Sequence, residues 1–264
     1  GCLFWDRISD YNLLSNTEEF SYAGTNPCAE EPLPAGGSCL LGSINLAEFV
    51  KNSFTENAEF DFESFKYTVK ESIVALNEVL DEGLALHPLE EQRNSVRDWR
   101  QVGLGIMGLA DMLIKLGITY GSQEAIELCD TIGFIMANYS IKSSARLAKV
   151  YGTFPKCEIC DIVTTEYFCN NTDDRTRDLV LEYGLRNSQL LTIAPTGTLS
   201  TMLGISGGIE PIFANSYTRT TKSLHSEDVD YKVYTPIVEK YMKAHNVSDE
   251  NSLPKYFITA QDLN

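Results

Sequence analysis

Segments with helical periodicity alternate along this chain with short apolar runs, and this alternation constrains the fold more than any other feature. Apolar residues recur at spacings of three and four over residues 62–80 and again over residues 126–150, as on the buried face of a helix. Residues 189–193 form a short apolar run that leads into a polar loop, as a buried strand does. Strands that alternate with helices favour parallel packing, so the sequence predicts an α/β fold.

Glycines and the shorter apolar runs set the expected element boundaries. The two long helices are expected to end near Gly83 and at Gly152, because glycine readily adopts the left-handed conformation that closes a helix. Residues 209–213 and 256–259 are expected to form short strands, and residues 231–245 a further helix.

An amide, a thiol and a carboxylate stand at alternate positions in the segment Asn26-Pro27-Cys28-Ala29-Glu30. We expect this segment to be extended, because proline disfavours a helical conformation at the residue before it. Alternate side chains of an extended segment point the same way, so Asn26, Cys28 and Glu30 would project into one small volume. A thiol beside an acid/base group is typical of a reactive site, although a free cysteine is also often buried in a core. A second cysteine, Cys39, follows beyond a turn-rich run.

A candidate phosphate-binding loop follows the apolar run 189–193. Its residues offer hydroxyl groups, and Gly197 lets backbone N–H groups approach an anion closely. The loop contains no lysine or arginine, so it would hold phosphate by amides and hydroxyls, most readily where it opens a helix. The alternative is a polar turn that only caps the next helix. The candidate residues are Ala194, Pro195, Thr196, Gly197, Thr198, Leu199 and Ser200.

Two further motifs, a glycine-rich segment and a C-x-x-C pair, are weaker evidence for a functional site. Residues 103–111 (GLGIMGLAD) have the glycine spacing of a dinucleotide-binding loop, but we favour a helix whose small residues let it approach its neighbours, ending at Gly117. Cys157 and Cys160 form a C-x-x-C pair near Cys169, as in a redox pair or half of a zinc site. No histidine is close by to complete a ligand set, so we expect no metal and an exposed loop with incidental cysteines. A redox or zinc-binding module at Cys157 and Cys160 stays open as an alternative function.

Composition excludes some classes of function. The net charge of −16 argues against a nucleic-acid-binding surface, which needs a basic face. No apolar run approaches the roughly 20 residues of a membrane span, so no membrane partner is expected. Seven cysteines in a chain of 264 residues is an odd number, and it favours a reducing cytoplasm over a disulfide scaffold.

Five segments together resemble the catalytic subunit of ribonucleotide reductase. They are NPCAE, GGSCLLGSINL, GLGIMGLAD, RNSQLLTIAPTGTLS and GGIEPIF, in this order over nearly the whole chain. The motifs Asn-Pro-Cys and Ala-Pro-Thr-Gly-Thr resemble those of the adenosylcobalamin-dependent class II more than those of class I. Class I uses a separate radical-generating subunit, and it stays the alternative. Ala29 departs from the pattern, because many relatives carry glycine there, and this questions the local backbone freedom rather than the chemistry.

The resemblance implies a role for each candidate residue. Cys28 matches the cysteine that becomes a thiyl radical and abstracts the 3′-hydrogen of the ribose. Glu30 matches the base that takes the 3′-hydroxyl proton, and Asn26 positions the ribose. Cys39 matches one of the two cysteines that supply reducing equivalents and finish as a disulfide. The loop 194–200 matches the segment that holds the substrate phosphates.

The resemblance also implies the architecture and the partners. The family fold is a ten-stranded α/β barrel with a central finger loop, here about residues 24–34, and residues 1–264 would form a single α/β domain of it. We expect this chain to be a piece of a longer polypeptide. The N-terminal half-barrel and the C-terminal tail would be absent from this piece, and the piece would be inactive alone. The implied partners are a ribonucleoside di- or triphosphate, adenosylcobalamin, a thioredoxin-like or dithiol reductant, and a second copy in a homodimer.

Overall fold

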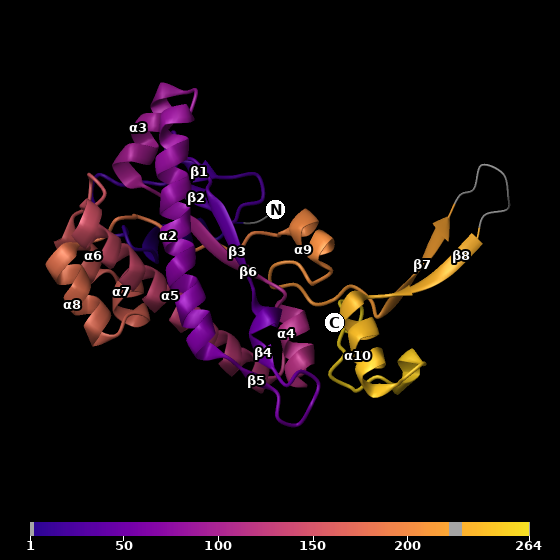
Figure 1. Ribbon diagram of the computed structural model, residues 1–264. Coiled ribbons are helices and arrows are strands. Elements are labelled where there is room, and N and C mark those ends of the chain that lie inside the picture. Colours follow the sequence, from indigo (N-terminus) through magenta and orange to yellow (C-terminus); the bar gives the residue numbers. More distant parts are fainter. Residues whose placement is uncertain (1–2, 222–228, 264) are drawn as a thin grey trace. The chain divides into compact units, whose positions relative to one another are not determined.

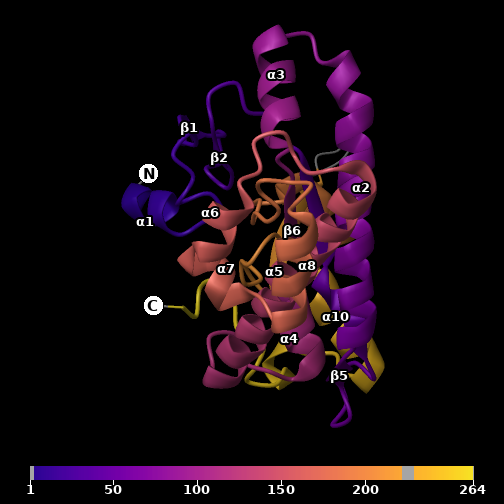
Figure 2. The same ribbon diagram turned by 90° about the vertical axis from the view of Figure 1, so that its left-hand side faces the viewer.

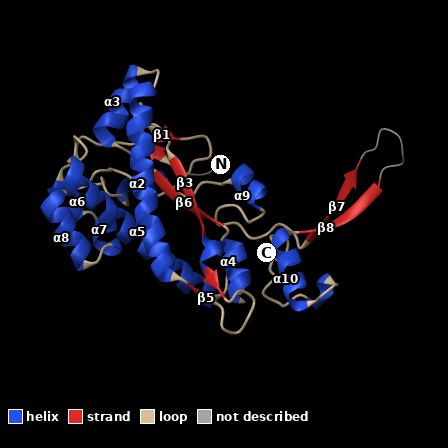
Figure 3. Cartoon of the chain, viewed as in Figure 1, coloured by secondary structure: helices blue, strands red, loops and turns tan. Residues whose placement is uncertain are grey.

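The computed structural model describes residues 3–221 and 229–263, and these form a mixed α/β structure with more helix than strand (Figures 1 and 3). The chain divides into two compact units, which are described separately. Unit 1 contains the described residues of Gly1–Ile44, Glu63–Gly105 and Asp130–Ala194, and unit 2 contains those of Asn45–Phe62, Ile106–Cys129 and Pro195–Asn264.

Helices make up more than half of unit 1. Buried apolar residues recur at helical spacing along α2, from Phe65 through Val69 and Ile73 to Leu80, so this helix buries one face. The short helices α6, α7 and α8 pack together (Figure 2). The helices of unit 1 are α1 (Trp5–Asp10), α2 (Phe62–Leu86), α3 (Glu90–Trp99), α5 (Gln123–Tyr151, from residue 130 on), α6 (Ile159–Thr164), α7 (Glu166–Asn171) and α8 (Asp174–Tyr183).

A small sheet lies at the centre of unit 1. Strand β3 (Leu41–Asn45) pairs with β6 (Gly103–Met107), and Leu104 of β6 forms a parallel bridge with Leu191. Every residue of β6 is buried. The glycines of β6 permit this packing, because a methyl group on Gly105 would lie 2.5 Å from the Thr192 carbonyl oxygen and one on Gly103 would lie 2.6 Å from the Thr192 side chain. A second pair of short strands, β1 (Gly24–Thr25) and β2 (Pro32–Leu33), forms an antiparallel hairpin.

A buried polar network fixes the segment that leads into residue 191. The Asn187 side chain exchanges hydrogen bonds with Asn77 of α2, accepts one from the Ser144 hydroxyl of α5, and donates one to the Arg100 carbonyl oxygen. Arg100 also donates to Asp81 over 2.6 Å. Because buried polar groups are costly when unpaired, this network allows one register for residues 187–191.

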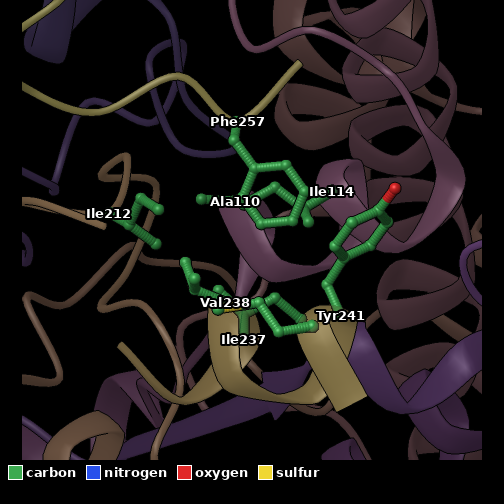
Figure 4. Packing of buried hydrophobic residues seen from close by; sticks show 8 residues of the cluster. Ala110, Ile114, Ile212, Ile237, Val238, Tyr241 and Phe257 are labelled. Atoms are coloured by element: carbon green, nitrogen blue, oxygen red, sulfur yellow. The ribbon is translucent and has the colours of Figure 1, made fainter. Parts of the chain in front are cut away.

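Unit 2 is organised around an apolar cluster. Figure 4 shows Ala110 and Ile114 of one helix, Ile237, Val238 and Tyr241 of another, and Phe257 of the C-terminal segment facing one another. Strands β7 and β8 form an antiparallel hairpin that reaches from Ser216 paired with Tyr234 to Thr221 paired with Val229. The elements of unit 2 are the 3₁₀ helices Leu46–Phe49 and Glu250–Ser252, strands β4 (Val50–Lys51), β5 (Glu59–Phe60), β7 (Ser216–Thr221) and β8 (Val229–Tyr234), and helices α4 (Leu109–Leu116), α9 (Gly197–Leu203) and α10 (Pro236–His245).

Helix ends with local signals are confirmed. Gly117 closes α4 and Gly152 follows the end of α5, both with a positive φ. The expected end of α2 near Gly83 is short by one turn, since the helix continues to Leu86.

Other expectations are wrong because tertiary contacts decide the conformation. Residues 103–107 form strand β6 rather than the start of a helix, since β3 and the segment at Leu191 provide strand partners on both sides. Residues 231–234 belong to β8, and the helix begins only at Pro236. The expected strands 189–193, 209–213 and 256–259 reduce to single bridges, Leu104 with Leu191 and Ile212 with Thr259. Among the described residues, no helix is long and apolar enough to span a membrane.

Replacing Gly105 by alanine should destabilise the chain, because the added methyl group meets backbone that cannot move aside. We expect a loss of about 1–3 kcal/mol in the free energy of unfolding, as for overpacked cores. The matched control is Gly133→Ala in α5, where a methyl group meets nothing within 4 Å and should stabilise the helix by roughly 0.5–1 kcal/mol. Urea denaturation measures both, and equal effects of the two substitutions would contradict the close approach at β6.

Candidate active site

The β1–β2 hairpin presents the first candidate residues on a tight turn. The Asn26 N–H donates to the Glu31 carbonyl oxygen over 3.2 Å, and the Asn26 side-chain oxygen accepts the Glu31 N–H over 3.0 Å. The Ala29 N–H donates to the Asn26 carbonyl oxygen over 2.9 Å. The expectation of an extended segment is therefore wrong, because these bonds close residues 26–31 into a loop and strict alternation of side chains does not apply.

Ala29 adopts the left-handed conformation with φ of +63°. This conformation favours glycine, because a Cβ atom adds a steric cost of about 1 kcal/mol. The departure from glycine noted in the sequence thus falls at a position of positive φ, where alanine carries this cost.

Two residues of the 189–192 segment hold the hairpin in place. The Thr192 hydroxyl donates to the Glu30 carbonyl oxygen over 2.5 Å. The Gln189 amide donates to the Tyr22 hydroxyl over 2.6 Å and to the Pro32 carbonyl oxygen over 3.1 Å. Sequence reasoning gave neither residue a role, although both stand in the RNSQLLT segment that resembles the reductase family.

Cys28 is exposed at the hairpin tip, whereas Asn26 and Glu30 are partly buried. The pKa of the Cys39 thiol is influenced by Glu31, Glu30 and Cys28, so the structure brings Cys28, Glu30 and Cys39 into one electrostatic neighbourhood. The Asn26 side chain takes part in the turn, because its oxygen accepts a hydrogen bond from the Glu31 N–H.

Glu31 is an acidic residue of this site that sequence reasoning missed. Its side chain is only 2% exposed. Burial raises its pKa from the ordinary value of 4.5 to about 7, and the nearby Cys39 thiol partly offsets this rise. The pKa of Cys39 is in turn raised to about 12, first by desolvation and then by the neighbouring Glu31 carboxylate. The available signal in the sequence was a second glutamate directly after the NPCAE motif.

The candidate phosphate loop lies at the start of α9. Thr196 takes a left-handed conformation with φ of +51°, and its hydroxyl accepts the Gly208 N–H over 2.9 Å. The Ser200 hydroxyl donates to the Gly197 carbonyl oxygen over 3.2 Å. Thr198 is exposed, whereas Thr196 and Ser200 are buried. Pro195, Gly197 and Leu199 are exposed as well, so Thr198 carries the one exposed hydroxyl of the loop.

Two other glycine segments support this loop. A methyl group on Gly207 would lie 2.8 Å from the Pro195 carbonyl oxygen, so glycine is needed for close contact. The Ser206 N–H donates to the Asp111 carboxylate over 2.7 Å, and the Gly108 N–H donates to the Ser206 carbonyl oxygen over 2.8 Å. The end of GLGIMGLAD thus holds the GGIEP segment, which holds the loop.

The cysteines outside the hairpin region do not form a metal site among the described residues. Cys157, Cys160 and Cys169 are free, and within residues 3–221 and 229–263 no three His, Cys, Asp or Glu side chains group as metal ligands. Burial raises the pKa of Cys157, which lowers its reactivity as a thiolate. The redox or zinc-binding alternative gains no support from this part of the chain.

Comparison with known proteins gives a consistent set of relatives. The family described as "Ribonucleotide reductase, barrel domain" matches residues 1–263. A vitamin B12-dependent ribonucleoside-diphosphate reductase of Thermoplasma acidophilum is 36% identical over 219 residues, which cover 83% of this chain and 25% of that protein. A ribonucleoside-diphosphate reductase subunit alpha of Chlamydia pneumoniae is 32% identical over 246 residues, covering 83% of this chain and 23% of that protein.

A solved structure shares the fold. The alpha subunit of the class Id ribonucleotide reductase of Actinobacillus ureae superposes with a TM-score of 0.64 at 22% identity, covering 94% of this chain and 40% of that chain. The chain spans about a quarter of the length of the curated relatives described above.

The buried Glu31 predicts a pH-dependent stability. The folded state holds the Glu31 proton up to pH about 7, whereas an unfolded glutamate releases it near 4.5. The unfolding free energy of the wild type should therefore fall, relative to Glu31→Gln, as pH rises from about 4.5 to 7, by about 3 kcal/mol in all. Urea denaturation at pH 4.5, 6 and 8 measures this difference.

The matched control is Glu18→Gln, because Glu18 is an exposed glutamate of the same unit. The difference in unfolding free energy between Glu18→Gln and the wild type should change little over this pH range. A difference for Glu31→Gln that stays constant from pH 4.5 to 8 would contradict the raised pKa.

Proposed function

Because this chain belongs to the family of the ribonucleotide reductase barrel domain, we propose that it forms part of a class II enzyme. This enzyme reduces ribonucleotides to 2′-deoxyribonucleotides by a thiyl-radical mechanism that depends on adenosylcobalamin. The observation that carries the proposal is the hairpin that exposes Cys28 beside Glu30 and Cys39. Since the chain spans about a quarter of its relatives, the activity belongs to a longer protein.

In this proposal the hairpin turn sets the roles of its side chains. Cys28 is exposed at the tip, where its sulfur can be oxidised to a radical and take the 3′-hydrogen of the ribose. Glu30 receives the 3′-hydroxyl proton, and its backbone is fixed by Thr192. The Asn26 side-chain oxygen is bound to the Glu31 N–H, so its NH₂ group is the part that donates to the ribose.

Cys39 supplies one of the two thiols that provide the reducing equivalents. Two thiols give two electrons and two protons and become a disulfide, while the 2′-hydroxyl leaves as water. The second thiol belongs to the longer protein, and a separate thioredoxin-like or dithiol reductant restores the pair. The substrate is a ribonucleoside di- or triphosphate.

The loop 194–200 binds the substrate phosphates in this proposal. Thr198 and the backbone amides at the start of α9 supply the donors, and Gly207 and Gly208 hold the loop from behind.

Relatives of both classes bear on the cofactor. The Thermoplasma relative is named as vitamin B12-dependent, whereas the Chlamydia relative is named as a subunit alpha. Bound adenosylcobalamin supplies the one-electron chemistry that oxidises a thiol. The exposed Cys28 fits this need, because its sulfur is reachable from outside the chain. The class I enzyme, in which a second subunit supplies the radical, is the second candidate.

The remaining expectations form part of the proposal. Residues 1–264 would be a single domain within a ten-stranded barrel, with residues 24–34 as its finger loop, and the chain alone would be inactive. The full protein would be a cytoplasmic homodimer.

Cys28→Ser in the full-length protein should lower ribonucleotide reduction by roughly 1,000-fold or more, because a serine oxygen does not replace the sulfur radical. The assay measures reduction of cytidine diphosphate and triphosphate with a dithiol, with and without adenosylcobalamin. Activity that requires adenosylcobalamin alone supports class II. Activity that appears only with a second metal-containing protein assigns class I, and full activity in Cys28→Ser refutes the thiyl role.

Gly207→Ala should weaken substrate binding, because its methyl group would push against the Pro195 carbonyl oxygen and displace the loop. We expect KM to rise about tenfold with a smaller change in kcat, as when binding rather than chemistry is lost. The control is Gly83→Ala, where a methyl group meets nothing within 4 Å. Steady-state kinetics decide, and an unchanged KM in Gly207→Ala would argue against phosphate binding at the loop.

A further inference from the structure

A cavity of about 230 Å³ lies beside Cys39 in unit 1. Helices α2 and α3 supply part of its wall, and residues 38–40 supply the part that carries the thiol. The volume corresponds to about eight molecules of liquid water, so a small molecule fits the cavity and a folded domain does not. Because Cys39 is exposed and lines the cavity, such a molecule can reach its sulfur.

Aliphatic side chains form much of the cavity wall. Val79, Leu80 and Leu84 of α2 line it, together with Val96 of α3. Among the described residues that line it, none is a lysine, arginine, aspartate or glutamate. The cavity therefore suits an uncharged ligand with an alkyl stem, because apolar surface gains free energy when it leaves water, whereas a charge loses its hydration without an ionic partner.

The cavity wall also carries polar groups that can orient a ligand. Ser38 Oγ lies 3.2 Å from His87 Nε2, and both residues line the cavity. Gln101 is only 3% exposed, and its side-chain NH₂ group donates to the Gln189 side-chain oxygen, which fixes its orientation. Within the described part of the chain, the Gln101 side-chain oxygen has no hydrogen-bond donor. A buried acceptor without a donor costs free energy, so a ligand N–H group at this wall removes that cost.

We propose that this cavity binds a small neutral dithiol, whose alkyl stem ends in a carboxamide, and that this dithiol reduces a disulfide at Cys39. The proposal rests on the proposed function, in which Cys39 finishes each turnover as half of a disulfide. The alkyl stem contacts the aliphatic wall, and the carboxamide N–H donates to Gln101. The acidic neighbours of Cys39, Glu30 and Glu31, further disfavour an anionic ligand.

The reduction balances as two thiol–disulfide exchanges at Cys39. One ligand thiol loses its proton, and its sulfur bonds to the Cys39 sulfur, which breaks the disulfide and releases the other cysteine. The second ligand thiol then attacks the ligand sulfur bonded to Cys39, so that Cys39 is released and the ligand leaves as a cyclic disulfide. The two protons that the ligand thiols lose end on the two cysteines, and two electrons pass with them.

The first test measures binding without any reductase activity. Dihydrolipoamide represents this class of dithiol, and octanamide has the same alkyl stem and carboxamide but lacks the thiols. At about 10 mM, octanamide should slow the alkylation of Cys39 by iodoacetamide in the full-length protein at least about threefold, as a ligand of this size with a millimolar Kd does. Mass spectrometry of the Cys39 peptide gives the rate.

Two controls show whether this protection is specific. Alkylation of the exposed Cys160 in the same protein should not change. Octanoate, the anion with the same stem, should leave Cys39 unprotected, because the described residues that line the cavity include no lysine or arginine. The proposal is overturned if octanamide leaves the Cys39 rate unchanged, slows Cys160 as much as Cys39, or protects no better than octanoate.

A variant that fills the cavity tests where octanamide binds. Leu84→Trp adds volume at the wall and should abolish the protection of Cys39. The matched control is Leu86→Trp, since Leu86 lies on the same helix, is 75% exposed and is not among the residues that line the cavity. If Leu84→Trp also accelerates alkylation of the half-buried Cys157, which indicates unfolding, Val79→Trp replaces it. Protection that survives in a folded cavity-filling variant overturns the proposal.

The second test measures ribonucleotide reduction with dihydrolipoamide as the reductant. The rate should saturate at millimolar dihydrolipoamide, and Leu84→Trp should raise the KM for dihydrolipoamide about tenfold while the KM for the ribonucleotide stays unchanged. An unchanged KM for dihydrolipoamide, or turnover with a thioredoxin-like protein alone, overturns the small dithiol as the reductant. If the wild type reduces no ribonucleotide with any reductant, the proposed function fails, and protection by octanamide still decides whether the cavity binds this ligand.

Discussion

Thr192 makes the two contacts that join the central sheet of unit 1 to its β1–β2 hairpin. Its backbone approaches Gly105 so closely that only glycine fits there, and its hydroxyl holds the Glu30 carbonyl oxygen. One residue thus joins the central sheet to the hairpin that carries Cys28. The network around Asn187 fixes the register of this segment, so an error of one residue would misplace both contacts.

The surroundings of Cys39 are acidic. Enzymes that use cysteine as a nucleophile place it near cations or helix N-termini, which lower its pKa. Here Cys39 lies near Glu31 and Glu30, and its pKa is raised. The surroundings of Cys39 therefore differ from those of a nucleophilic cysteine.

The second candidate site has a supporting layer of its own. Gly207 allows close contact with Pro195, and Gly208 donates to the Thr196 hydroxyl. Asp111 holds the preceding residue, Ser206, from α4. Segments that resemble the family but contain no reactive group therefore support the backbone of the loop 194–200.

The sequence by itself determined the family and the helix ends with local signals such as Gly117 and Gly152. These depend on neighbouring residues, so a single segment is enough to read them. The sequence did not determine that residues 103–107 form a strand, that residues 26–31 form a turn, or that Glu31 lies buried beside Cys39. Partners far along the chain decide those features, because strand pairing, burial and the pKa of a thiol depend on which segments the tertiary structure brings together.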